Sequence, residues 1–264
     1  SFTFANIMQT TAIINHISHW LKAYAKSSAV KGFVIGISGG IDSAVTSTIA
    51  AKTGLPLLCL EMPIHQNEIQ VERGLKHIDW LKESFDNVST LELKLSSVFD
   101  SFSSQLPKNE IQNELALVNT RARLRMTTLY YFAQINHSLV LGTGNKVEDF
   151  GIGFFTKYGD GGVDISPIAD LLKTEIYAIG KVLGINNEIL TAAPTDGLWG
   201  DNKNDEEQIG ASYPELEWAM AFNEDTNSLT EREKKVLQIY IKLNRENQHK
   251  MNAIPICKIP KNLK

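Results

Sequence analysis

The sequence predicts an α/β fold built on a doubly wound parallel sheet with flanking helices. Short apolar runs alternate along the chain with amphipathic segments that are long enough to be helices. The apolar runs are continuous, as expected for strands that are buried on both faces. Polar, glycine-rich segments follow the first and the fourth run. Ligands bind at the carboxyl ends of such strands, where the strand order reverses.

Four apolar runs are interpreted as the strands. The first, Phe33-Val34-Ile35-Gly36-Ile37, leads directly into a glycine-rich turn, and Pro63 stops the second. The fourth ends in Gly142-Thr143-Gly144. The predicted strands are residues 33–37, 57–62, 88–93 and 138–141.

Helical periodicity fills the intervals between the strands. The first helical face carries Ile7, Ile14, Ile17, Leu21 and Tyr24. Residues 43–52 form the next helix, with Gly54 just beyond its end. Further helices are predicted for residues 68–84 (apolar side Ile69, Leu75, Ile78 and Leu81), 114–136, 174–183 (closed by Gly184) and 231–248 (opened by a capping box at Thr230). Loops are predicted for residues 101–112, 150–170 and 196–210.

Composition restricts the possible functions. The 264 residues carry a net charge of −4 and are 43% hydrophobic, so we expect one globular domain over residues 1–264. The acidic balance argues against a dedicated nucleic-acid or membrane-surface partner, and no segment has the pattern of a membrane span or signal peptide. Cys59 and Cys257 form no CxxC pair, which predicts a reducing, cytoplasmic location rather than a disulfide scaffold or cysteine-rich zinc site.

The turn after the first strand is the main chemical signal. Residues 36–43 read GISGGIDS, and two adjacent glycines let backbone N–H groups converge on an anion. The following helix adds its free N–H groups and the positive end of its dipole, while Ser38 and Ser43 offer hydroxyls. The segment lacks the lysine of a Walker loop and the spacing of GxGxxG. It therefore predicts a phosphate or pyrophosphate site of another type.

Asp42 adds a negative charge to this predicted phosphate site. A carboxylate repels polyphosphate unless a cation bridges the two, so Asp42 predicts Mg²⁺. The alternative is an ordinary strand–turn–helix junction in which Asp42 is only a first-turn charge.

The motif resembles the pyrophosphatase loop of the ATP-pyrophosphatase synthetases. Five further segments, in order, resemble the NAD synthetase family: residues 122–126, 142–148, 153–164, 193–195 and 249–250. The resemblance spans residues 31–250. It implies a Rossmann-like fold of the adenine nucleotide alpha hydrolase type. It also implies ATP-dependent amidation of deamido-NAD through an acyl-adenylate, with release of AMP and pyrophosphate.

The resemblance also implies residue roles. The ATP phosphates would lie on Gly36, Ile37, Ser38, Gly39, Gly40, Ile41, Asp42 and Ser43, with further ATP contacts from Thr143, Lys173 and Thr195. Asp42 and Glu148 would ligate Mg²⁺. The deamido-NAD residues would be Arg123, Lys157, Asp160, Asp164, His249 and Lys250. Many family members have TDHAAE where residues 143–148 read TGNKVE, which leaves the neighbours of Glu148 open.

Residue chemistry leaves some of these roles open. Lys173 precedes a helix, where the dipole disfavours a cation unless an anion lies nearby; alone, it reads as an exposed lysine. Arg123 and Arg125 are two residues apart on a helix, so at most one points at a given ligand. Lys157 and Asp164 lie in a glycine-rich loop that can close over substrate. His249 and Lys250 suit a helix C-terminus in any case.

The resemblance also bears on partners. The synthetase pattern begins by residue 31, so no fused glutaminase is expected and free ammonia is the expected donor. Relatives of this type are homodimers, and residues 7–24 and 114–136 are candidate contact surfaces. Residues 101–112 and 196–210 are candidate lids.

Two alternative functions remain. One is that of another ATP-pyrophosphatase synthetase, such as a tRNA-modifying or GMP-forming enzyme. The other is that of a non-enzymatic adenine-nucleotide-binding module.

Overall fold

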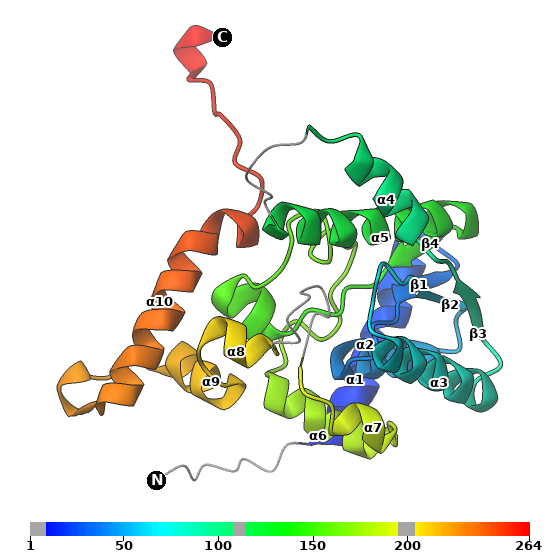
Figure 1. The fold of residues 1–264 in the computed structure, drawn as a ribbon, viewed down its shortest axis with the longest axis horizontal. Coiled ribbons are helices and arrows are strands. Elements are labelled where there is room, and N and C mark those ends of the chain that lie inside the picture. The colour runs from blue at the N-terminus through cyan, green and yellow to red at the C-terminus, as the bar shows by residue number, and fades with distance from the viewer. Residues whose placement is uncertain (1–8, 108–113, 195–203) are drawn as a thin grey trace.

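A four-stranded, all-parallel sheet forms the centre of the computed structural model, which describes residues 9–107, 114–194 and 204–264 (Figure 1). The strand order is β3-β2-β1-β4, so the chain first builds outward from β1 and then returns to place β4 on its other side. The predicted doubly wound parallel sheet is therefore confirmed. The strands are β1 (Gly32–Gly36), β2 (Leu57–Glu61), β3 (Val88–Glu92) and β4 (Ser138–Val140).

Helices cover both faces of the sheet, because the side chains of β1 alternate between two apolar cores. Phe33 and Ile35 pack with one core and Val34 with the other. The first core joins α1 (Thr10–Ser27), α2 (Ile41–Ala51), α3 (Glu68–Ser84) and α6 (Lys173–Leu183). The second joins α4 (Ser96–Ser104) and α5 (Glu114–Asn136).

A third apolar cluster forms a lobe beside the sheet. The π-helical segment η1 (Lys146–Ile152) packs there on α9 (Tyr213–Ala221) and α10 (Glu231–Met251). Figure 1 shows the chain beyond α10 running away from this lobe. The remaining elements are α7 (Asn187–Leu190), α8 (Asp205–Ile209), η2 (Thr226–Ser228) and η3 (Lys261–Leu263). In the described part of the chain, no helix is long and apolar enough to cross a bilayer.

Most predicted elements are confirmed, with corrections where tertiary packing prevails. Residues 101–104 belong to α4 rather than to a loop, and residues 150–152 belong to η1. Ile69, predicted on the apolar side of α3, is 67% exposed, because the buried face of that helix turns toward Gln70, His77 and Ile78 instead. Residues 205–209 form α8 inside a predicted loop. Ile7 and residues 108–112 and 196–203 lie outside the described residues.

Candidate active site

The loop between β1 and α2 has a backbone that only glycine suits at one point. Gly39 has φ +74°, and a Cβ there would lie 2.5 Å from the carbonyl oxygen of Gln70. The two serine hydroxyls brace the loop from within. Ser38 Oγ accepts the Gly40 N–H at 3.2 Å, and Ser43 Oγ donates to the Gly40 carbonyl at 3.0 Å. The first N–H groups of α2, which have no partner within the helix, remain for an anion.

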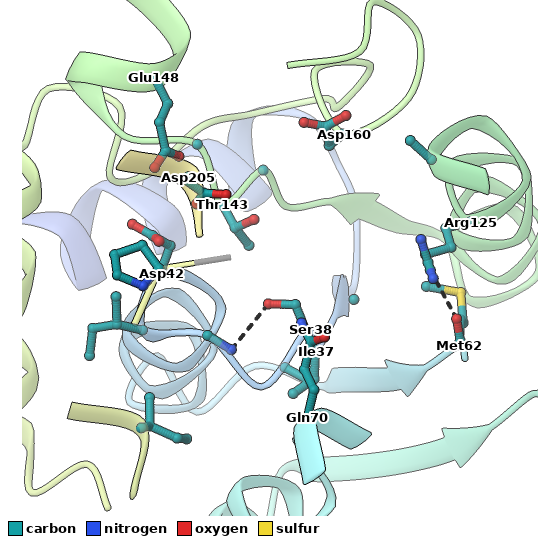
Figure 2. A pocket seen from close by; sticks show the side chains of 18 of the residues that line it. Ile37, Ser38, Asp42, Met62, Gln70, Arg125, Thr143, Glu148, Asp160 and Asp205 are labelled. Carbon is teal, nitrogen blue, oxygen red and sulfur yellow. Dashed lines mark hydrogen bonds between the residues drawn. The ribbon is translucent and has the colours of Figure 1, made fainter. Parts of the chain in front are cut away.

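The segment after β4 lies beside this loop. Because Phe33 pairs with Leu139 and Val34 with Val140, the carboxyl ends of β1 and β4 are neighbours. Between them opens a cleft of about 270 Å³ that Thr143, Asp160 and Asp42 line from three segments (Figure 2). The site thus lies at the reversal point that the fold predicts.

A buried ion cluster forms one wall of the cleft. Lys173, the first residue of α6, is 3% exposed, and its Nζ donates to Asp42 Oδ2 at 2.6 Å and to Glu148 Oε1 at 2.9 Å. Asn145 Nδ2 donates to Asp42 Oδ1 at 3.2 Å. The interpretation of Lys173 as an exposed lysine is therefore wrong. The two carboxylates offset the unfavourable helix dipole at this position.

Burial and charge act in opposite directions on these groups. Burial outweighs the attraction of Lys173 at Asp42 and, together with the charge of Glu148, raises the pKa of Asp42. At Glu148, burial is outweighed by Lys173 and by the Tyr213 hydroxyl, so the pKa of Glu148 is lowered. Despite burial, the two carboxylates raise the pKa of Lys173 and keep it charged.

Tyr213, the first residue of α9 and not among the predicted site residues, completes this cluster. Its hydroxyl donates to Glu148 Oε1 at 2.5 Å, and its ring centroid lies 4.7 Å from Lys173 Nζ. The pair is separated by 65 residues, and no local pattern links the first residue of a short helix to a distant acid. The sequence therefore carried no signal for this contact.

Three further carboxyls of the cleft, those of Asp160, Asp149 and Glu61, have a raised pKa. Burial raises the pKa of Asp160 to about 6, and Asp160 Oδ1 also accepts the Thr156 N–H at 3.0 Å. Burial, with the charge of Glu148 next, raises the pKa of Asp149 to about 8. Glu61, at the end of β2, also lines the cleft, and burial and Glu92 raise its pKa to about 7.

The predicted ATP residues mostly converge on the cleft. The lining residues among them are Gly36, Ile37, Ser38, Gly40, Ile41, Asp42, Thr143 and Lys173. Gly39 and Ser43 shape the loop from outside that lining. Thr195 lies outside the described residues.

The predicted deamido-NAD residues divide into two groups. Asp160 lines the cleft, whereas Arg123, Lys157, His249 and Lys250 do not. Beside the cleft, Arg123 in the middle of α5 and Lys157 of the following loop meet the C-terminal end of α10, which carries His249 and Lys250. There Arg123 Nε donates to the Lys157 carbonyl at 3.2 Å, and Lys157 Nζ donates to the His249 carbonyl at 2.7 Å. Lys250 Nζ donates to the Phe155 carbonyl at 2.8 Å.

Asp164 and Arg125 differ most from expectation. The Asp164 carboxylate accepts the Val140 N–H at 2.8 Å and the Tyr130 hydroxyl at 3.0 Å, so it ties the loop to β4 and α5 instead of lining the cleft. Of Arg123 and Arg125 on α5, Arg125 is the one that lines the cleft. Its Nε donates to the Met62 carbonyl at 2.9 Å.

The carboxylates present fit a divalent cation that binds together with phosphate. Asp42 and Glu148 converge on one positive charge, that of Lys173. Within residues 9–107, 114–194 and 204–264, no group of three His, Cys, Asp or Glu side chains could hold a metal alone. Mg²⁺ commonly takes one or two carboxylates and completes its shell with water and substrate phosphates. This donor set agrees with that pattern.

The fold and site define a nucleotide-binding α/β protein that places an anion loop opposite a buried carboxylate pair. The profile of the NAD synthase family matches residues 13–254. The chain is 37% identical to the NH3-dependent NAD(+) synthetase of Mesoplasma florum over 217 residues, which cover 81% of this chain and 86% of the relative.

Two solved structures share the fold over nearly their whole length. The NMN synthetase of Francisella tularensis has a TM-score of 0.83 and 29% identity, covering 96% of this chain and 99% of that one. The NH3-dependent NAD synthetase of Campylobacter jejuni, in complex with the nitrate ion, has a TM-score of 0.75 and 26% identity, covering 95% and 100%. The chain belongs to the NAD synthase family and is a ligase of NAD biosynthesis. This assignment favours the synthetase interpretation over both alternatives.

Proposed function

We propose that this chain amidates deamido-NAD to NAD, using ATP and free ammonia. The observation that carries the proposal is the buried Asp42–Lys173–Glu148 cluster opposite the β1–α2 loop, in a chain of the NAD synthase family. The name of the Mesoplasma florum relative supports ammonia as the nitrogen donor.

The first step activates a carboxylate. The nicotinate carboxylate oxygen attacks the α-phosphorus of ATP, a new oxygen–phosphorus bond forms, and the α–β phosphoanhydride bond breaks to release pyrophosphate. The loop of residues 36–43 and the N-terminus of α2 hold the phosphates by backbone N–H groups. Lys173 offers a positive charge to the departing pyrophosphate. These groups act by position and electrostatics, so no protein nucleophile is needed.

The second step forms the amide. Ammonia attacks the activated carbonyl, the carbon–nitrogen bond forms, and the carbon–oxygen bond to AMP breaks. The nitrogen then loses a proton. Asp160 lines the cleft with a pKa raised to about 6 by burial, which suits a group that accepts this proton near neutral pH.

Asp42 and Glu148 are the residues that would hold Mg²⁺, which would neutralise phosphate charge when bound. The Lys173 ammonium lies between these two carboxylates and pairs with both. ATP would give Lys173 a new anionic partner, so that both cations can be accommodated.

Three further proposals concern the domain organisation, the oligomeric state and the cellular location of the protein. We propose one catalytic domain over residues 1–264, because the three apolar clusters all border the same cleft. We propose a homodimer through α5, on which Tyr131 and Ile135 are 63% and 57% exposed. A cytoplasmic location is proposed because Cys59 and Cys257 are free thiols.

Product analysis tests the reaction. ATP, Mg²⁺, ammonium and deamido-NAD are supplied together and then omitted one at a time, with NAD, AMP and pyrophosphate as readouts. Equal yields of NAD and AMP that depend on every component are expected. AMP without NAD would reject free ammonia as the donor, and ATP binding without either product would reject the synthetase activity.

A second substrate is favoured by one comparison. The similar structure from Francisella tularensis is an NMN synthetase, and the acid that corresponds to NMN carries the same nicotinate carboxylate. The same assay with nicotinate mononucleotide in place of deamido-NAD compares the two. If kcat/KM is higher for nicotinate mononucleotide than for deamido-NAD, the mononucleotide is the preferred substrate.

A further inference from the structure

We propose that Tyr213 is a positioning residue that holds the Glu148 carboxylate in place for a divalent cation. The inference rests on the proposed function, in which Asp42 and Glu148 take Mg²⁺ together with ATP. It assigns to α9 a part in the site that its position in the sequence does not suggest.

The geometry at Glu148 is the first argument. Lys173 Nζ and the Tyr213 hydroxyl both donate to the same oxygen, Oε1, at 2.9 and 2.5 Å. Because both of these donors lie on Oε1, we assign the other oxygen, Oε2, to the cation. A carboxylate fixed through one oxygen cannot rotate freely about its own bond, so its second oxygen has a defined direction.

The hydroxyl can donate only one proton, and the distances decide where it goes. Asp205 Oδ2 lies 3.5 Å from the Tyr213 oxygen, which is the limit of a hydrogen bond, whereas Glu148 lies at 2.5 Å. Both neighbours are carboxylate oxygens, which accept hydrogen bonds, so the Tyr213 hydroxyl is the donor. Tyr213 therefore donates to Glu148 and not to Asp205.

Tyr213 is itself held firmly. Its side chain is 3% exposed and packs in the third apolar cluster with Val147 of η1, the segment that carries Glu148. Its N–H donates to Glu206 Oε1 at 2.7 Å, which joins α9 to α8. Because its surroundings hold Tyr213 in place, its hydroxyl restricts the position of the Glu148 carboxylate to which it donates.

A second link joins α9 to the same wall of the cleft. The Glu217 carboxylate accepts the Thr174 N–H at 2.9 Å and the Thr174 hydroxyl at 2.8 Å. Thr174 follows Lys173 in the first turn of α6. Helix α9 thus fixes Glu148 through Tyr213 and the start of α6 through Glu217, which holds Glu148 and Lys173 in a fixed arrangement relative to each other.

Tyr213→Phe is the direct test, because it removes the hydroxyl and keeps the ring that covers Lys173 and fills the apolar cluster. We expect the Mg²⁺ concentration for half-maximal rate to rise about tenfold, as for a lost hydrogen bond to a charged group. The kcat at saturating Mg²⁺ is expected to stay within about twofold of wild type. A readout without turnover is Mn²⁺ binding in the presence of a non-hydrolysable ATP analogue, followed by electron paramagnetic resonance, with the same weakening expected.

Tyr240→Phe is the matched control. Tyr240 lies on α10, is partly buried in the same apolar cluster, and is not among the cleft-lining residues. It should leave the metal dependence unchanged. A double-mutant cycle adds Glu148→Gln: if Tyr213 acts through Glu148, Tyr213→Phe has little further effect on Mn²⁺ binding in the Glu148→Gln background.

The outcomes separate the inference from the proposed function. Unchanged Mn²⁺ binding in Tyr213→Phe, or fully additive effects in the cycle, would overturn the role of Tyr213 while the proposed reaction stands. A fall in kcat at every Mg²⁺ concentration with a matching loss of thermal stability would also overturn it, since that indicates a merely structural residue. If the wild-type protein with the ATP analogue bound no Mn²⁺, the metal part of the proposed function would fail first.

Discussion

The role of each charged residue in this cleft depends more on its neighbours than on its own side-chain chemistry. Asp42 and Lys173 would be ordinary surface charges at the starts of two helices if α2 and α6 were apart. Packing of these helices buries the Lys173 side chain and leaves that of Asp42 only 18% exposed, with Nζ 2.6 Å from Oδ2. A buried charge with a partner is retained, and one that loses its partner becomes costly.

Asp42→Asn should lower kcat/KM about 100-fold or more, because the amide keeps the shape of the side chain and removes the charge that a cation needs. Steady-state rates over a wide range of Mg²⁺ concentrations check this. Asp170→Asn, at an exposed ion pair with Lys146, is the matched control and should be neutral. Full activity of Asp42→Asn at every Mg²⁺ concentration would show that Asp42 holds no metal.

Lys173→Met should let Mn²⁺ bind without nucleotide. Removal of the ammonium leaves two buried carboxylates that repel each other, so a divalent cation gains a site that Lys173 otherwise fills. We expect nucleotide-free Mn²⁺ affinity to rise about tenfold or more relative to wild type, measured by electron paramagnetic resonance. Lys146→Met serves as control. Equal affinities in variant and wild type would contradict competition between Lys173 and the metal.

Glu61→Gln should change how stability depends on pH. Glu61 is 5% exposed, its Oε2 has no hydrogen-bond partner in the described residues, and burial raises its pKa from 4.5 to about 7. Since the folded protein binds this proton more tightly than the unfolded chain, Glu61 lowers stability as pH rises from about 4.5 to about 7. The variant should therefore have a higher Tm than wild type at pH ~8 and lose that advantage at pH ~5.

Thermal unfolding at both pH values measures this difference. Glu83→Gln on the exposed side of α3 is the control and should show the same difference from wild type at each pH. If Glu61→Gln were no more stable at high pH than at low pH, Glu61 would not carry the predicted proton.

At the scale of elements, the strand–loop–helix unit of residues 32–51 forms most of the anion site. The loop is short because Gly39 takes a left-handed backbone that lets it pass close to α3. The β4–η1 segment brings Glu148 to it, and α9 supports that acid from behind. The site therefore depends on the β1–α2 loop, the β4–η1 segment and helix α9, which meet at one edge of the sheet.

Gly39→Ala tests the β1–α2 loop. The added Cβ would meet the Gln70 carbonyl at 2.5 Å, in a backbone that already disfavours side chains, so we expect a loss of about 3 kcal/mol in the free energy of unfolding and weaker ATP binding. Gly54→Ala is a close control: Gly54 has φ +72°, and its added Cβ would meet nothing within 4 Å. It should cost only about 1 kcal/mol. Equal losses in chemical denaturation would rule out the close approach as the cause.

At the scale of the whole molecule, two cores and one lobe enclose the cleft, and a further subunit is proposed on α5. Tyr131 and Ile135 are one helical turn apart, so they share an exposed apolar face. A face of this kind on a folded domain commonly marks an interface. Arg123 of α5 and Lys157, whose carbonyl it contacts, lie beside the cleft rather than within it.

Ile135→Asp should therefore weaken the proposed dimer, because an interface would bury the new charge without a partner. Sedimentation equilibrium over a range of protein concentrations measures the dissociation constant of the dimer. We expect this constant to be at least about tenfold higher than for wild type. Val182→Asp, at a position of similar exposure (57%) on α6, is the control. A wild-type protein that is monomeric at all concentrations would contradict the dimer itself.

Local patterns in the sequence are enough to predict the four strands, the longer helices and the chemistry of the loop. Continuous apolar runs predict buried parallel strands, and the order of runs and helices predicts the doubly wound sheet, because both signals are local. The GISGGIDS turn likewise predicts an anion site from its own glycines and hydroxyls. The resemblance to the NAD synthetase family added Glu148 and Lys173 to the predicted site residues.

Which side chains meet in the cleft depends on how distant parts of the chain pack together. Lys173 lies 131 residues from Asp42 and becomes its buried partner, Tyr213 reaches Glu148 across 65 residues, and Asp164 turns to the backbone of β4 instead of the cleft. Periodicity reports which side of an element is buried but not against what it packs. Contacts between residues far apart in the chain depend on how whole helices and strands are placed, and that placement gives each acid and base its neighbours.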